Sequence, residues 1–70
     1  SPVAASLSDM VTSKQLGMIR GLARQLHVNA ETECSAEFNC SVTELSRRAA
    51  SRFIDKLQAM QPTAQMRMAG

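Results

Sequence analysis

The sequence predicts an all-α fold, a compact three-helix bundle. Three stretches carry apolar residues at three- and four-residue steps, the spacing of one helix face. The 70 residues contain two Phe and no Trp or Tyr, so a core must come mainly from Leu, Ile, Val, Met and Ala. Because β-branched and aromatic residues are scarce, a sheet is not favoured. The expected helices span about 13–27, 30–39 and 47–60.

The same patterns predict one domain over residues 11–60. The flanking segments are small and polar, so we expect a flexible linker over 1–10 and a disordered tail over 61–70. No apolar run approaches the roughly 18 residues that a membrane span requires. The first residues lack a basic start followed by an apolar stretch, so we expect no signal peptide.

The first helix has a clear start signal. Thr12 and Gln15 have the spacing of a capping box, in which each side chain bonds the other residue's backbone N–H. Val11 and Leu16 can form a hydrophobic staple around it. An apolar face follows, made of Leu16, Ile19, Leu22, Ala23 and Leu26. His27 ends this helix, as a cap or surface residue rather than a catalytic base.

Gly17 and Gly21 lie four residues apart inside the first helix. Each costs roughly 1 kcal/mol relative to Ala in a helix interior, so their presence needs a reason. We expect that they allow another helix to approach closely. Close approach of a ligand or phosphate to the backbone is the alternative.

The other two helices are predicted from caps and stripes. Asn29 can cap the second helix, whose inner face would be formed by Ala30, Cys34 and Phe38. Ser46 can cap the third, and Pro62 marks its stop. The apolar stripe of the third helix is formed by Ala50, Phe53, Ile54 and Leu57, with Met60 as an extension.

Charge is segregated along the chain, although the net charge is only +2. Residues 12–27 hold three basic side chains and no acid, 28–45 hold four Glu and no base, and 46–60 hold four basic side chains and one Asp. If the outer helices pack side by side, their basic ridges converge into one positive surface. The candidate nucleic-acid-binding residues are Lys14, Arg20, Arg24, Arg47, Arg48, Arg52 and Lys56.

Several function classes find no support in the sequence. The only His has no obvious partner, and three short helices offer no deep pocket, so we expect no enzyme, no cofactor and no small-molecule substrate. We interpret Cys34 as a buried thiol; a local disulfide with Cys40 is an alternative. A metal site built from His27 and both cysteines lacks a fourth ligand, so no metal is expected. A reducing cytoplasm suits this cysteine usage.

Two segments together carry a resemblance. TSKQLGMIRGLAR at 12–24 and ELSRRAASRFIDKL at 44–57 resemble a small helical module of bacterial and phage proteins. It is similar to the C-terminal segment of Rad52-type DNA annealing and double-strand-break repair proteins and of related phage recombination proteins. The resemblance implies that Gln15 is a capping partner, Ser51 a small residue at a helix contact and Asp55 a polar tie to another helix. The family pattern has an acid where this chain has Ala49.

These observations give a leading hypothesis and two others. The leading one is a non-catalytic accessory module of a DNA recombination or repair protein, with weak and largely sequence-independent contacts to DNA through its basic face. No Tyr or Trp exists and both Phe occupy core positions, so base stacking is not expected. The alternative is a protein docking or oligomerisation module, which exposure of Met18 would favour. A passive spacer without a ligand is the third.

Overall fold

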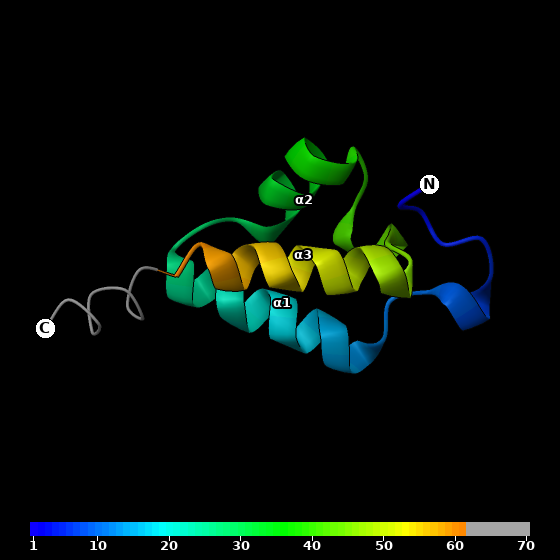
Figure 1. Ribbon diagram of the computed structural model, residues 1–70, viewed down its shortest axis with the longest axis horizontal. Helices are drawn as coiled ribbons and strands as arrows, with labels where there is room; N and C mark the ends of the chain where they lie inside the picture. Colours follow the sequence, from blue (N-terminus) through cyan, green and yellow to red (C-terminus); the bar gives the residue numbers. More distant parts are fainter. Residues whose placement is uncertain (62–70) are drawn as a thin grey trace, which may run out of the picture.

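The computed structural model describes residues 1–61 and confirms the all-α, three-helix bundle (Figure 1). Helix α1 spans Ser13–Leu26, α2 spans Ala30–Phe38 and α3 spans Arg47–Ala59. Two short 3₁₀ helices accompany them, η1 over Leu7–Asp9 and η2 over Val42–Glu44. None of the helices in this part of the chain is long and apolar enough to cross a membrane.

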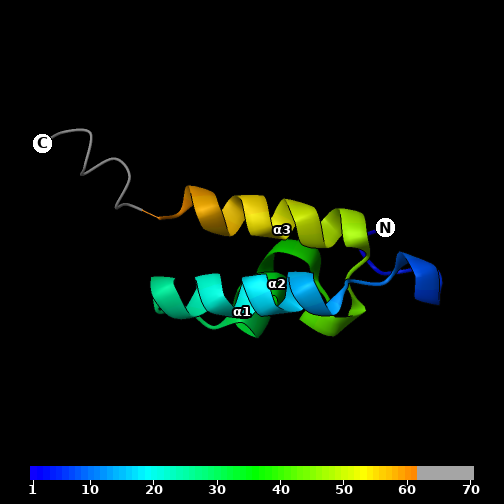
Figure 2. The same ribbon diagram turned by 90° about the horizontal axis from the view of Figure 1, so that it is seen from below.

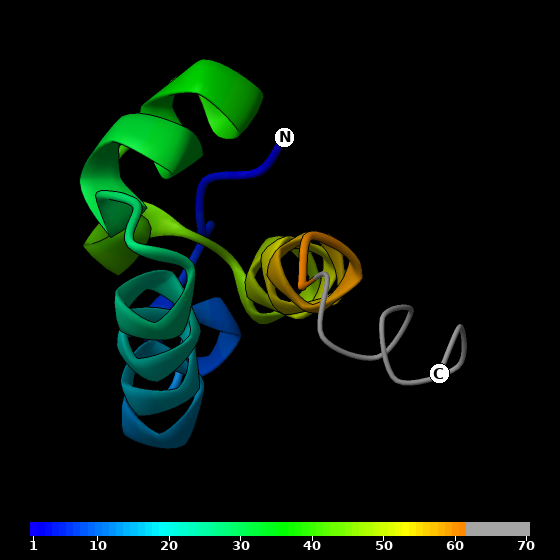
Figure 3. The same cartoon turned by 90° about the vertical axis from the view of Figure 1, so that its left-hand side faces the viewer.

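Helices α1 and α3 lie side by side and run in the same direction (Figures 1 and 2). Helix α2 and η2 lie between them in sequence and return the chain to the end where α1 began. The view along the bundle shows α1, α2 and α3 at the corners of a triangle (Figure 3). The starts of the two outer helices are therefore neighbours, although residues 13 and 47 are far apart in sequence.

All three predicted helix starts are confirmed. The Thr12 hydroxyl accepts from the Gln15 backbone N–H at 3.0 Å, and the Gln15 side chain accepts from the Thr12 N–H at 3.0 Å. The Asn29 side chain accepts from the Thr32 N–H, and Ser46 accepts from the Ala49 N–H. Each pairing satisfies a backbone donor that the first helical turn leaves without an intrahelical partner.

Each helix ends one residue before its expected last residue. His27 and Asn39 both take left-handed backbone conformations with φ of 60°, and their N–H groups close the preceding turns. Asn adopts this conformation more readily than most residues, which suits it to the cap position that follows a helix. Residue 39, the expected last residue of the second helix, is therefore the C-cap of α2 and not part of it.

The core lies where the three helices and η2 meet. Its largest fully buried side chains are Ile19, Cys34, Val42, Leu45, Phe53 and Leu57. Phe38 of α2 packs edge-on against Phe53 of α3, with ring centroids 5.8 Å apart and planes at 86°. This T-shaped geometry is favourable for two aromatic rings and joins α2 to the outer pair.

Residues 1–10 are attached to the bundle, which the prediction of a flexible linker misses. Val3 and Met10 form antiparallel bridges with Leu45 and Ser46. The Ser46 N–H donates to Pro2, the Ala4 N–H donates to Glu44, and the Val11 N–H donates to Leu45. The extended backbone between η2 and α3 has peptide groups that need partners, and the N-terminal segment supplies them. Apart from Gln61, the predicted tail over 61–70 lies outside the described residues.

The glycines of α1 do not serve the packing that we expected. Gly17 and Gly21 are both exposed, and a Cβ added at either position would meet nothing within 4 Å. Neither α2 nor α3 approaches this strip of α1. The close-packing interpretation is therefore wrong, because the apolar face of α1 is turned away from its glycines.

Candidate functional site

The starts of α1 and α3 are joined by a set of polar contacts. The Gln15 side-chain amide donates to the carbonyl of Arg47 at 3.2 Å, and the Arg47 Nε donates to the carbonyl of Met10 at 3.1 Å. The bridge between Met10 and Ser46 lies beside them. Gln15 therefore both caps its own helix and fixes the neighbouring one, so the two N-termini are held at one end of the bundle.

This end carries an unusual distribution of charge. Lys14 lies in the first turn of α1, while Arg47 and Arg48 lie in the first turn of α3. Neither first turn contains Asp or Glu. Helix N-termini carry a positive dipole end that acids stabilise and bases oppose, so these three exposed cations work against helix stability. We call this group, Lys14, Arg47 and Arg48, the cationic end.

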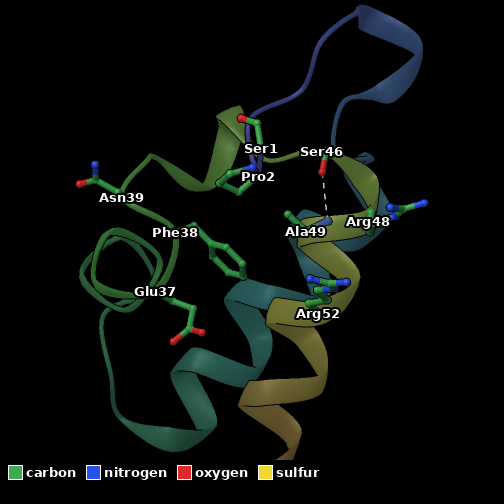
Figure 4. Close-up of a pocket in the computed structure, with 9 residues that line it drawn as sticks. All are labelled: Ser1, Pro2, Glu37, Phe38, Asn39, Ser46, Arg48, Ala49 and Arg52. Atoms are coloured by element: carbon green, nitrogen blue, oxygen red, sulfur yellow. Dashed lines mark hydrogen bonds between the residues drawn. The ribbon is translucent and has the colours of Figure 1, made fainter.

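The predicted basic residues of α3 do not all act in the same way. Lys56 forms an ion pair with Glu37 of α2, and its hydrogen bond to that carboxylate raises the pKa of Lys56. Arg48 and Arg52 instead line a groove between α2 and α3 (Figure 4). One of the four basic side chains of α3 is thus neutralised by the acid-rich helix.

The ridge formed by Arg20 and Arg24 does not converge with the basic residues of α3. Gln15 bonds Arg47, and Gln25 bonds Gln61 just after α3, so both glutamines mark the flank of α1 that faces α3. At about 100° per residue, Arg20 lies about 140° around the helix from both. Arg24 lies about 180° from Gln15, although only about 100° from Gln25, and it is near the far end of α1 from the cationic end. The structure therefore separates these two exposed arginines from the cationic end.

The two cysteines are free thiols. Cys34 is fully buried, as expected, and burial together with the neighbouring Cys40 raises its pKa to about 12. A thiol held in this way stays protonated at neutral pH and behaves as a small apolar side chain. In residues 1–61 no group of three or more His, Cys, Asp or Glu side chains is placed to hold a metal ion.

One feature of the site was missed by sequence reasoning. Phe38, which the sequence predicts on the inner face of the second helix, packs against the core but is only half-buried and lines the groove beside Arg48 and Arg52. The exposure of Phe38 could have been inferred from the small number of apolar residues in α2, because few apolar neighbours are available to bury its last turn. Pro2 also lines the groove, and its position depends on the N-terminal pairing described above.

Comparison with known proteins does not extend the resemblance seen in the sequence: no family model, curated protein or solved structure matches this chain. The role that the resemblance gave to Gln15 agrees with its capping bonds. Ser51 and Asp55, in contrast, are exposed. Within residues 1–61 Asp55 has no hydrogen bond or ion pair, so it is not a tie between helices here.

Proposed function

We propose that this domain is a non-catalytic accessory module of a DNA recombination or repair protein. It contacts the nucleic-acid backbone through the cationic end, with Arg52 beside it. The observation that carries the proposal is the pair of parallel helices whose neighbouring first turns hold three basic residues and no acid. Such an end attracts phosphate through both side-chain charge and helix dipoles. The repair context rests on the resemblance over residues 12–57.

The geometry limits what kind of binding this is. Phosphate contacts position a protein on nucleic acid but carry no sequence information, so binding is largely sequence-independent. Arg20 and Arg24 lie on another flank, and Lys56 is engaged with Glu37. At most four basic side chains therefore act together, and affinity is weak and sensitive to salt. A reducing cytoplasm suits the two free thiols.

A salt-dependent titration against short duplex and single-stranded DNA tests the proposal. The test variant combines Lys14→Gln with Arg48→Gln, and the matched control combines Arg20→Gln with Arg24→Gln. Both remove two positive charges from exposed helix positions. Each lost phosphate contact on a duplex reduces the slope of log K against log salt by about 0.9, so the first variant loses up to about 1.8 and the control retains its slope.

Arg47 is left unchanged in this experiment because its side chain bonds the Met10 carbonyl, and its removal would perturb the fold. Circular dichroism confirms that both variants stay folded. If both pairs of substitutions weaken binding equally, the contact depends on net charge alone and the cationic end is not a site. If the folded wild-type domain gives no signal at low salt, the proposal fails.

A second function, protein docking, is favoured by the groove that contains Phe38. Its lining combines two arginines with apolar surface, a mixture that a nucleic-acid backbone alone does not use. Met18 is also 45% exposed on α1. The groove gives the more specific argument and is developed next.

A further inference from the structure

The groove lies between α2, the first turns of α3 and the N-terminal segment (Figure 4). Its volume is about 510 Å³, within the range of about 300–1,000 Å³ in which proteins bind small ligands and side chains. The ring of Phe38 points from α2 toward α3, and Ala49 and Pro2 add apolar surface beside it (Figure 4). The groove thus has an apolar floor that a ligand side chain can cover.

The charged groups of the groove are not balanced. Arg48 and Arg52 lie one helical turn apart on the α3 wall, and Glu37 lies on the opposite wall. Glu37 forms an ion pair with Lys56, which does not line the groove, so the negative charge of Glu37 is already compensated. Two arginines remain exposed beside the apolar floor, and guanidinium groups pair with carboxylates in planar, bidentate geometry.

We propose that this groove binds a short acidic peptide segment that carries an apolar side chain. Its carboxylates contact Arg48 and Arg52, and its apolar side chain covers Phe38 and Ala49. Charge complementarity selects the acid, and the apolar floor selects a peptide over a bare phosphate chain. This inference goes beyond nucleic-acid binding and stands without it.

The test titrates the full chain with a capped pentapeptide, Glu-Glu-Leu-Glu-Glu, in the absence of nucleic acid. Amide shifts by NMR report the location of binding and its affinity. We expect saturable shifts at Phe38, Asn39 and Ala49. The Arg52→Gln variant should bind about fivefold more weakly, the upper range for one solvent-exposed ion pair. The Arg24→Gln variant makes the same charge change on α1, outside the groove, and should bind the peptide as the wild type does.

Two control peptides separate the parts of the proposal. Gln-Gln-Leu-Gln-Gln removes the acids, and Glu-Glu-Ser-Glu-Glu removes the apolar side chain; both should bind more weakly than the parent peptide. Equal effects of Arg52→Gln and Arg24→Gln would overturn the proposal, as would shifts confined to residues outside the groove. Groove shifts produced by an oligonucleotide but not by the peptide would also overturn it. Because the titration contains no DNA, its failure leaves the DNA experiment independent.

Discussion

The outer helices and the middle helix are attached to the bundle in different ways. Helices α1 and α3 each present a long apolar stripe, and α3 alone buries Ala49, Ala50, Phe53, Ile54 and Leu57. Helix α2 has nine residues and buries only Cys34 fully. It is also attached through partly buried Ala30 and Phe38 and through polar contacts from Glu31 and Glu37. Burial of apolar surface holds the outer pair, while a few separate contacts hold α2.

The difference teaches where this domain can open. An element with few buried contacts has a lower free energy of local opening than the core around it. The groove is formed between the strongly held α3 and the weakly held α2. One wall is therefore fixed and the other can adjust, which suits a site that accepts a short segment.

The largest loss of stability should come from removing Phe53, the buried member of the aromatic pair. Phe53 has no exposed surface, so Phe53→Ala should cost about 3–5 kcal/mol of the free energy of unfolding. Phe38→Ala should cost less, about 1–2 kcal/mol, because half-buried Phe38 loses less apolar contact. Urea denaturation measures both. Equal costs would show that α2 is held as firmly as α3.

A second prediction concerns the polar attachment of α2. The Glu31 carboxylate accepts from the Ser41 hydroxyl and the Val42 N–H, both at 3.1 Å. Glu31→Ala should cost about 1 kcal/mol, since the partly buried Val42 donor loses its partner. Hydrogen exchange should quicken in α2 and η2 before α1 and α3. Glu33→Ala is the control, with the same charge change in the same first turn; similar losses from both would exclude a specific role for Glu31.

The exposed glycines of α1 should give a gain of similar size. Gly17→Ala and Gly21→Ala should each raise the free energy of unfolding by about 1 kcal/mol, because Ala is the better helix former and the added Cβ meets open space. Thermal and urea midpoints measure this gain. A loss of stability at either position would mean that a part of the chain packs against that strip. These substitutions strengthen the outer pair without touching α2.

The last prediction concerns an effect that is absent at neutral pH, the pH dependence that Cys34 brings to α2. Its pKa rises from 9.0 to about 12 in the folded state, so the unfolded thiol releases its proton first as pH increases. Stability should therefore fall between about pH 9 and 12 and be unaffected by Cys34 below this range. The Cys34→Ala variant should lose this part of the decline. At neutral pH, alkylation should modify half-buried Cys40 before Cys34.

Local signals made much of the fold predictable. Thr12, Asn29 and Ser46 fix the helix starts through contacts three residues away, and each apolar stripe identifies an inner face. The attachment of residues 1–10 was not predictable in this way, since its bonds join backbone groups and require no particular side chains. The candidate site was predictable as a set of basic residues only. Which of them meet depends on the flank of α1 that faces α3, a property of the assembled bundle.

The parallel course of α1 and α3 also has a directional consequence. Peptide dipoles of two helices that run the same way add, and α2 is too short to cancel them. The α1–α3 pair therefore carries helix dipoles that point the same way, with Lys14, Arg47 and Arg48 at their positive ends. In the field of an anionic rod such a body turns its tip toward the rod. Under the proposed function, a tip-first approach covers a short stretch of the nucleic acid.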